Sequence, residues 1–227
     1  MTYRLADTAF TLDTVYDRTQ KMLADYITDD TPSFSITVTG EDIDRERARM
    51  DGGFSDRYLE TLAVYRKLCD RLLEKDVLLF HGSAVAVDGA VYLFAAKSGT
   101  GKSTHVRLWR ERFGDRAVMV NDDKPLLGIR PEGVTVYGTP WDGKHRLSSN
   151  VALPLKALCL LERDGTNHIE RVRPETALPA LLQQAYRAES MERILPLVLR
   201  LAEAVPLYRL GCNMDPEAAE VAWMGMQ

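Results

Sequence analysis

One segment of eleven residues constrains this chain more than any other, because it combines glycines with a lysine and hydroxyl side chains. Residues 95–105 read Ala-Ala-Lys-Ser-Gly-Thr-Gly-Lys-Ser-Thr-His and follow the apolar run 90–94. The order predicts a strand, a tight turn and a helix. Gly99 and Gly101 permit a positive φ, so successive N–H groups can converge on an anion at the positive end of the helix dipole. We therefore expect a phosphate-binding loop.

The residues expected to bind a nucleotide follow from this loop. Lys102 would reach the β- and γ-phosphates, and the Ser103 hydroxyl would complete a Mg²⁺ shell. The general pattern G-x-x-x-x-G-K-[ST] has glycine where this chain has Ala96, which is sterically acceptable if φ is negative there. The alternative is a chance Gly-Thr-Gly turn. The expected cofactors are ATP and Mg²⁺, and the expected nucleotide-binding set is Ser98, Gly99, Thr100, Gly101, Lys102, Ser103 and Thr104.

Two adjacent acids end a short apolar strand downstream of the loop. Residues 117–127 read Ala-Val-Met-Val-Asn-Asp-Asp-Lys-Pro-Leu-Leu. Adjacent carboxylates repel each other, so one pKa rises unless a cation lies between them. Beside a phosphate loop that cation would be Mg²⁺, held by one aspartate, while the other accepts a proton from an attacking hydroxyl. The alternative is a solvated polar turn, because Asn-Asp-Asp is also good turn chemistry.

A β-hairpin is expected just before the loop. Residues 77–80 are apolar and lead to His81-Gly82-Ser83, and the turn Asp88-Gly89 joins the next strand to the one that enters the loop. Ordinary P-loop folds instead build a parallel sheet through helical crossovers. His81 lies at the end of the hairpin opposite this turn, which is the phosphate side. A lone histidine is also commonly a hydrogen-bonded structural residue, and that alternative stays open.

The order His-Gly, hairpin, Ser-Gly-x-Gly-Lys-Ser, strand and Asp-Asp resembles the catalytic core of HPr kinase/phosphorylase. It is more distantly similar to ATP-dependent phosphoenolpyruvate carboxykinases, whose loop also reads Ser-Gly-Thr-Gly-Lys. The resemblance implies an ATP- and Mg²⁺-dependent kinase acting on a hydroxyl of a peptide or protein serine or of a small molecule. It implies active-site roles for His81, Asp122 and Asp123. We expect Asp122 to accept the hydroxyl proton with His81 nearby, and Asp123 to hold Mg²⁺ together with Ser103.

Two other functions remain alternatives. One is a carboxykinase-like enzyme acting on a small phosphorylated acid, which would need arginines for two carboxylates. The other is a non-catalytic nucleotide-binding or peptide-chaperoning module. Lys102, Ser103 and the acid pair argue against the second alternative.

A glycine-containing segment follows the acids. Residues 137–146, Tyr-Gly-Thr-Pro-Trp-Asp-Gly-Lys-His-Arg, look like a segment of small stand-alone kinase-like proteins related to HPr kinase. Pro140 and Trp141 would stiffen the loop. Lys144 and Arg146 would place two cations beside the phosphates, so both are predicted catalytic residues. The alternative is a solvated basic turn. Neither His105 nor His145 receives a role.

Composition and charge exclude several classes of partner. The chain has 227 residues, 45% hydrophobic and 27% charged, with a net charge of −4 and bases interspersed with acids. This argues against a broad nucleic-acid surface. The sequence shows neither an apolar run of eighteen residues nor a signal peptide, so we expect a cytoplasmic protein without a membrane partner. Cys69, Cys159 and Cys212 lack metal spacing and are expected to be buried reduced thiols. A homo-oligomer stays open.

The remaining patterns predict an α/β fold, with a mixed hairpin-rich sheet, flanking helices and a likeness to the HPr kinase C-terminal domain. We expect an N-terminal β-containing appendage over 1–50 and a P-loop kinase-like catalytic domain over 51–227, together one compact unit. Strands are expected at 33–38 and 206–210, hairpins at 126–137 and 155–172, and helices at 14–26, 55–75, 175–188, 191–204 and 216–224.

Overall fold

The computed structural model describes residues 1–143, 145–185 and 191–227. Contacts divide it into two compact units, Met1–Lys75 and Asp76–Gln227, which are described separately. The sequence placed a boundary at residue 50 instead. The difference concerns one helix, α3 (Asp56–Leu73), which packs on α2 (Gly40–Ala48) and therefore belongs to the first unit.

The first unit joins a small sheet to helices. The strands β1 (Thr2–Leu5) and β2 (Thr8–Asp13) form an antiparallel hairpin, and β3 (Phe34–Thr37) pairs with β2 in parallel. The helix expected over 14–26 is two short pieces, α1 (Arg18–Met22) and the 3₁₀ turn η1 (Ala24–Tyr26). The apolar residues of α3 recur at helical spacing and are fully buried, including Leu59, Val64, Leu68 and Leu72.

The helix α2 was not predicted, because its acids and bases looked like a solvated charge pattern. It begins with a capping box in which the Thr39 N–H donates to the Asp42 carboxylate at 2.9 Å. Asp42 also accepts a hydrogen bond from Lys67 at 2.6 Å. Glu46 accepts one from Arg66 Nε at 2.5 Å. The overlooked signal was a threonine followed three residues later by an acid.

The second unit is built on one mixed sheet. Its strands run in the order β4-β8-β9-β10-β6-β5-β7, with β12 paired to β10 and β11 paired to β12. This confirms the expected mixed α/β class. The strands are β4 (Val77–Leu79), β5 (Ser83–Val87), β6 (Ala90–Ala95), β7 (Ala117–Asn121), β8 (Leu126–Arg130), β9 (Gly133–Tyr137), β10 (Ala152–Arg163), β11 (His168–Arg171) and β12 (Leu207–Cys212).

The long strand β10 connects the two parts of this sheet. Its first residues pair antiparallel with β9, where Ala152 lies opposite Tyr137. From Leu155 onward it runs parallel to β6, with an irregularity before Ala157, and from Leu158 parallel to β12. The sheet therefore mixes hairpins with parallel crossovers around one central strand.

Two of the three predicted hairpins are confirmed and one is wrong. The β5–β6 hairpin places Ser83 opposite Phe94, and β8 pairs antiparallel with β9. The hairpin expected over 155–172 does not form, because β12 lies between β10 and β11 and pairs with both. The turn at Asp164-Gly165 predicts only that the chain reverses. It does not reveal that a buried later strand inserts between its two arms.

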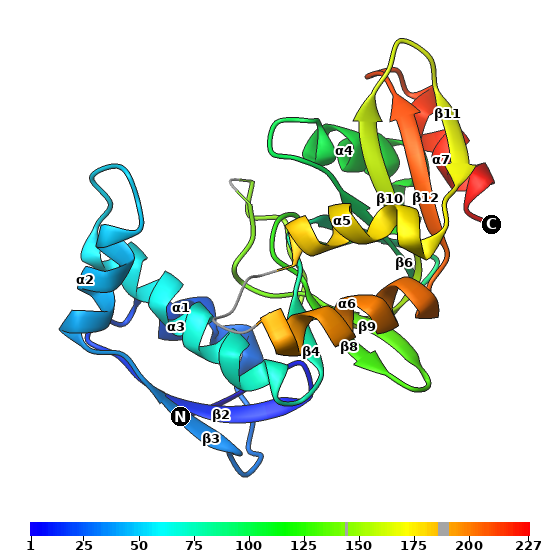
Figure 1. Cartoon of the computed structure of the whole chain (residues 1–227). Helices are drawn as coiled ribbons and strands as arrows, with labels where there is room; N and C mark the ends of the chain where they lie inside the picture. Colours follow the sequence, from blue (N-terminus) through cyan, green and yellow to red (C-terminus); the bar gives the residue numbers. More distant parts are fainter. Residues whose placement is uncertain (144, 186–190) are drawn as a thin grey trace. The chain divides into compact units, whose positions relative to one another are not determined.

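Helices cover both faces of the sheet (Figure 1). One face packs against α4 (Lys102–Phe113) and α7 (Glu217–Gly225), with the 3₁₀ turn η2 (Gly114–Arg116) after α4. On the other face α5 (Pro174–Gln184) packs against α6 (Met191–Ala204), and α6 contacts β8 and β9. No helix within the described ranges is long and apolar enough to cross a membrane.

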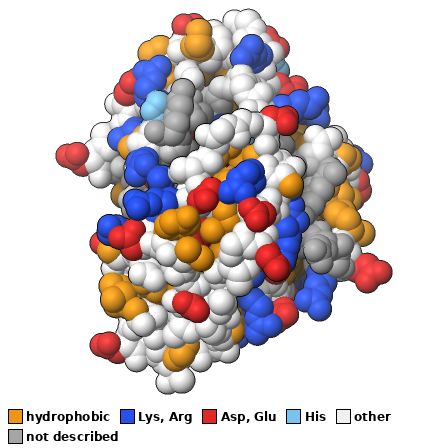
Figure 2. Space-filling view, turned by 90° about the vertical axis from the view of Figure 1, so that its left-hand side faces the viewer, with side chains coloured by type: hydrophobic (Ala, Val, Ile, Leu, Met, Phe, Trp, Pro, Cys, Tyr) orange, Lys and Arg blue, Asp and Glu red, His pale blue; other side chains and the backbone are white. Residues whose placement is uncertain are grey.

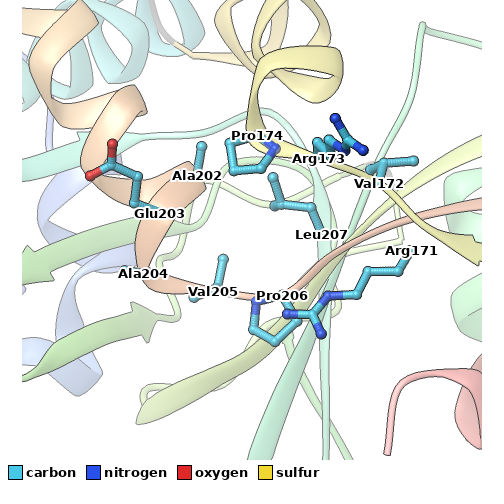
Figure 3. Close-up of a pocket in the computed structure, with 10 residues that line it drawn as sticks. All are labelled: Arg171, Val172, Arg173, Pro174, Ala202, Glu203, Ala204, Val205, Pro206 and Leu207. Carbon is cyan, nitrogen blue, oxygen red and sulfur yellow. The ribbon is translucent and has the colours of Figure 1, made fainter.

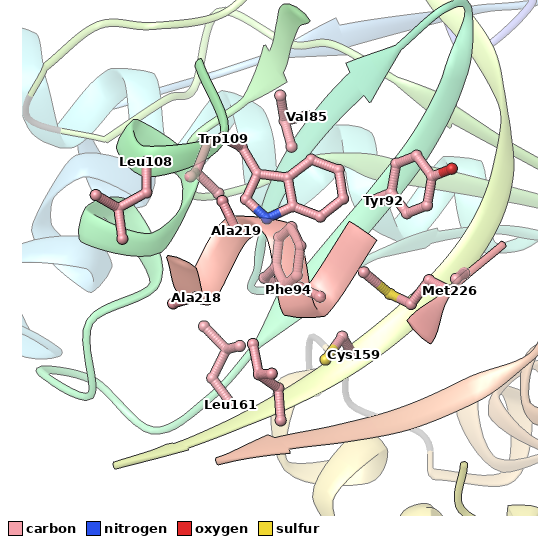
Figure 4. Packing of buried hydrophobic residues seen from close by; sticks show 14 of the residues in the cluster. Val85, Tyr92, Phe94, Leu108, Trp109, Cys159, Leu161, Ala218, Ala219 and Met226 are labelled. Carbon is pink, nitrogen blue, oxygen red and sulfur yellow. The ribbon is translucent and has the colours of Figure 1, made fainter. Parts of the chain in front are cut away.

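The largest aromatic cluster lies under α4 (Figure 4). The Trp109 ring is fully buried, 4.8 Å from the ring of Tyr92 and 5.2 Å from that of Phe94 between centroids. Its indole N–H donates to Nε2 of His105 at 2.9 Å. Burial lowers the pKa of His105 to about 4, so this imidazole is a neutral core residue. The cluster fixes α4 against the strand that enters the phosphate loop.

The cysteines and the surface charges complete the description. Cys69 and Cys159 are buried and Cys212 is half-buried, and these three cysteines form no disulfide in the described part of the chain. On the face drawn in Figure 2, Lys and Arg side chains are interspersed with Asp and Glu, and hydrophobic side chains lie between them.

Candidate functional site

The loop between β6 and α4, predicted to bind phosphate and here called the phosphate loop, has the conformation that its glycines permit. Between β6 and α4, Gly99 adopts φ = +78° and Gly101 φ = +123°, whereas Ala96 is not among the residues with positive φ. The Thr100 N–H donates to the Lys97 carbonyl at 3.2 Å. A Cβ at either glycine would meet nothing within 4 Å, so the positive φ and not a lack of space favours glycine at both positions. The missing first glycine of the general pattern is therefore tolerated without strain.

Lys102 and Ser103 open α4 at this loop. The Lys102 ammonium folds back and donates to the Ala96 carbonyl at 2.9 Å. Burial lowers its pKa, and the charges of Asp123 and Asp122 oppose that shift. The amine is thus held close to both acids and to the start of the helix, where the backbone dipole favours an anion.

Asn121 builds the turn that carries the two acids. Its Oδ1 accepts hydrogen bonds from the backbone N–H groups of Asp123 at 2.8 Å and Lys124 at 2.6 Å. Its Nδ2 donates to the Thr139 carbonyl at 3.0 Å. A polar turn is therefore present, but the side chain that forms its hydrogen bonds is Asn121 and not either aspartate. Both aspartate side chains are left to line a cavity.

The two aspartates lie in different environments. Asp122 is buried, and its carboxyl is hydrogen-bonded to the hydroxyls of Ser83 and Ser103. Burial raises its pKa, although the two hydroxyls oppose the shift. The Asp122 carboxylate and the Ser103 hydroxyl thus form a pair of oxygens directly beside the phosphate loop. A hydroxyl and a carboxylate, completed by phosphate oxygens, are the kind of ligands that Mg²⁺ prefers.

Asp123 faces His81 instead. Its Oδ1 lies 3.2 Å from His81 Nε2, and its Oδ2 lies 3.2 Å from Lys124 Nζ. Burial alone would raise the pKa of Asp123, but the His81 hydrogen bond and the Lys124 charge outweigh it and hold the pKa below its usual value. Asp123 is therefore an ionised carboxylate with a side chain 27% exposed. The sequence had paired Asp122 with His81 and Asp123 with Ser103, and the geometry pairs them the other way round.

The segment after β9 folds over the acids. Gly138 is packed so closely that a Cβ there would lie 1.8 Å from the Ser149 carbonyl oxygen. Gly143 comes next to Asp122, since a Cβ would lie 3.0 Å from its Oδ2. Trp141 is buried and does not form an exposed wall. The glycines of this segment thus allow close backbone approach beside the carboxylates.

The structure describes only one of the two basic residues that were predicted to be catalytic in this segment. Lys144 lies outside the described residues. Arg146 is exposed with φ = +51°, and its backbone N–H donates to the Gly143 carbonyl at 3.0 Å. It is not among the residues that line the site cavity, whereas His145, which had no predicted role, is. The catalytic role of Arg146 stays a prediction.

One cavity of about 720 Å³ collects most of the expected site. Its lining includes residues of the loop between β6 and α4, the start of α4, His81, both acids, and Gly143, His145 and Leu147 of the following segment. Thr100 is the exception among the predicted loop residues, because it lines a second cavity of about 380 Å³ behind the loop. The predicted residues that line the larger cavity are His81, Ser98, Gly99, Gly101, Lys102, Ser103, Thr104, Asp122 and Asp123.

A third cavity, of about 510 Å³, contains none of the predicted residues (Figure 3). It lies where β11 leads into α5 and α6 leads into β12. Its lining includes Arg171, Arg173 and Glu203. The predicted residues that line a cavity therefore line the first two, not this one.

Comparisons with known proteins leave the family open. No family model matches the chain, and no curated protein matches it. Among solved structures, the fold is similar to that of the Hpr(Ser) kinase/phosphatase from Coxiella burnetii, with a TM-score of 0.32 and 11% identity. The match covers 55% of this chain and 88% of that one. A likeness of this strength does not assign a function, which has to come from the site itself.

Several residues of the site were not foreseen. The role of Asn121 could have been predicted from the sequence, because an asparagine side chain commonly forms a turn by accepting the N–H two residues later. Arg163 could not, since it comes from the end of β10 and its guanidinium donates to the carbonyls of Gly99 and Thr100. Gln184 is equally remote in sequence and contacts His81 at 3.0 Å. Only the folded sheet brings these side chains to the loop.

Proposed function

We propose that this protein is an ATP- and Mg²⁺-dependent kinase that transfers the γ-phosphoryl group to a hydroxyl. The observation that carries the proposal is that two adjacent carboxylates line the same cavity as the phosphate loop but contact different side chains. Asp122 lies against Ser103, and Asp123 lies against His81. Phosphoryl transfer needs these two functions, a metal contact and a proton acceptor, within reach of the same phosphate.

The residues suit a nucleotide and its metal. The N–H groups of residues 98–102 would hold the phosphates, and Lys102 would balance their charge. Ser103 and Asp122 would hold Mg²⁺, which when bound neutralises charge on the transferred group. Within the described residues no three His, Cys, Asp or Glu side chains form a metal cluster.

Asp123 is the proposed proton acceptor. It is ionised, more exposed than Asp122, and anchored by His81 on one side and Lys124 on the other. An acceptor hydroxyl that enters the cavity would give its proton to this carboxylate, whose oxygens keep lone pairs besides those that face His81 and Lys124. The hydroxyl oxygen would then form a bond to the γ-phosphorus while the bond from phosphorus to the β-phosphate oxygen breaks, and ADP would leave. His81 would keep the carboxylate oriented. This assignment exchanges the roles that the sequence had suggested for the two aspartates.

The test is ATP turnover by the purified chain, with and without candidate peptides and sugars as acceptors. Lys102→Ala should lower turnover by about 100-fold or more, which corresponds to about 3 kcal/mol of transition-state stabilisation. Lys97→Ala is the matched control, because Lys97 lies in the same loop but lines the cavity behind it. Wild-type turnover in the Lys102 variant would show that the loop is only structural.

A further inference from the structure

Gln184 connects α5 to the site. It is the last residue of that helix, and its side chain is buried. Its backbone carbonyl accepts the His81 N–H at 2.8 Å, and its side-chain Oε1 lies 3.0 Å from His81 Nδ1. The next residue, Ala185, forms a β-bridge with Phe80. One residue therefore holds His81 through both its backbone and its side chain.

The opposite nitrogen of the same ring faces Asp123. His81 Nε2 lies 3.2 Å from Asp123 Oδ1, and the Gly82 N–H donates to the Asp123 carbonyl at 3.1 Å. The Gln184 Oε1 and the Asp123 carboxylate are both acceptors. Each ring nitrogen of His81 therefore faces an oxygen atom of a neighbouring side chain. The three side chains form a continuous series of contacts from α5 to the acid, here called the Gln184–His81–Asp123 series.

We propose that Gln184 is a positioning residue for the phosphoryl transfer suggested above, on which this inference rests. The His81 side chain is 42% exposed, so packing leaves its ring room to turn. The amide of Gln184 fixes the ring orientation, and Nε2 then holds Oδ1 of Asp123. With Lys124 at Oδ2, the carboxylate keeps one orientation in the lining of the cavity. Loss of such an outer partner commonly costs about 10- to 100-fold in activity at comparable sites.

The experiment compares substitutions at Gln184 in the full chain. Gln184→Leu removes the side-chain oxygen that faces His81 but keeps a side chain of similar size, whereas Gln184→Glu keeps an oxygen at that position. Gln183→Leu is the control, because Gln183 precedes it on α5 with an exposed side chain. We expect Gln184→Leu to lower kcat for ATP turnover by about 10- to 100-fold with KM for ATP nearly unchanged. Gln184→Glu should stay within about threefold of wild type, as should Gln183→Leu.

Folding and function are separated by two further measurements. Unfolding midpoints show which variants are folded, and Gln184→Met replaces the leucine variant if that one is not. Nitrogen-15 NMR of the His81 ring reports its protonation and hydrogen bonding without any need for activity. The Nδ1 signal should change in Gln184→Leu and stay constant in Gln183→Leu.

The outcomes distinguish this inference from the proposed function. A wild-type protein that binds but never turns over ATP contradicts the proposed function, and the NMR comparison then decides the inference alone. A folded Gln184→Leu with wild-type kcat overturns the inference. So does an unchanged Nδ1 signal, or a glutamate variant as impaired as the leucine variant.

Discussion

Asp122 and Asp123 are adjacent in sequence but differ in every contact of their side chains. A strand that ends at Asn121 forces this difference, because the Asn121 side chain accepts the N–H groups of Asp123 and Lys124 and turns the chain. One carboxyl is then directed at Ser103 and the other at His81. Because the two carboxyl groups point to different partners, they are kept apart although both line the same cavity.

Substitution of each aspartate should therefore give a different defect. Asp122→Asn should lower turnover and raise the Mg²⁺ concentration needed for half-maximal activity, because a metal contact is lost. Asp123→Asn should lower kcat by about 100-fold or more with a near-normal Mg²⁺ requirement, because the proton acceptor is lost. Magnesium titrations of the two variants at saturating ATP provide the measurement. The reverse pattern would restore the assignment made from sequence, and two mild defects would support a mere turn.

Two buried glutamates of the first unit should respond oppositely to pH. Burial alone would raise the pKa of Glu46, but Arg66 and Arg49 outweigh it and hold the pKa below its usual value. Its stabilising contribution is present above the unfolded-state pKa of about 4.3 and is lost as the pH falls through the folded value. Burial raises the pKa of Glu60, whose carboxylate accepts the Val15 N–H at 2.6 Å. Its contribution is greatest below the unfolded-state pKa and falls as the pH rises through the folded one.

Chemical denaturation at pH 7 and pH 4 compares Glu46→Gln with Glu60→Gln. At pH 7 the Glu46 variant should lose about 1–3 kcal/mol of unfolding free energy, because charged hydrogen bonds are removed, and the loss should shrink at pH 4. The Glu60 variant should be less destabilised at pH 7 than at pH 4. Equal losses at both pH values would contradict the opposite pKa directions.

Among the elements, α4 does more than open the phosphate loop. Ser103, Val106, Arg107 and Arg110 line the site cavity and recur at helical spacing, so one face of the helix extends the cavity for about two turns. Arg107 is paired with Glu111 at 2.5 Å. The Arg110 guanidinium has no hydrogen bond or ion pair with another residue in the described part of the chain, although the Arg110 carbonyl accepts the Gly114 N–H. This face therefore offers a cation at a distance from the phosphates.

Arg110→Ala should then weaken binding of the acceptor more than it weakens binding of ATP. For the Arg110 variant we expect the KM for an acidic serine peptide to rise about tenfold, while the KM for ATP stays nearly unchanged. Arg112→Ala is the control, because Arg112 lies on the same helix but pairs with Glu220 at 3.7 Å. Steady-state kinetics with acidic and neutral peptides measure the effect. Equal changes for both peptides and both variants would remove this face from acceptor binding.

The elements also show how far sequence reasoning extends. The phosphate loop, the β5–β6 hairpin and the acid pair follow from local rules, because glycine, turn and strand preferences act over a few residues. The helix α2 was missed because its buried faces are charged, and charge is normally a surface signal. The place of β12 and the contacts of Gln184 and Arg163 depend on pairing between distant segments. No local pattern encodes those contacts.

The whole molecule consists of two compact units, and every residue assigned to the site lies in the second. Thermal or chemical unfolding should therefore show two transitions. Mg²⁺–ATP at 100 times its Kd should stabilise only the transition of residues 76–227, by about 2.7 kcal/mol. Glu46→Gln should lower only the other transition. Calorimetry with and without nucleotide measures both, and one cooperative transition that ATP shifts as a whole would contradict the division.

The position of β10 at the centre of the sheet has a consequence for the order in which the chain is made. The phosphate loop follows β6, and β6 has β10 as one of its two neighbours, with Val91 opposite Leu155. During synthesis the loop, the acids and the hairpins all leave the ribosome before β10, and β12 leaves later still. Until then β6 has an unpaired apolar edge, which is the kind of surface that nascent chains and chaperones must shield. The loop after β6 comes early in the chain, yet the strand that leads into it is paired on both edges only once β10 has been made.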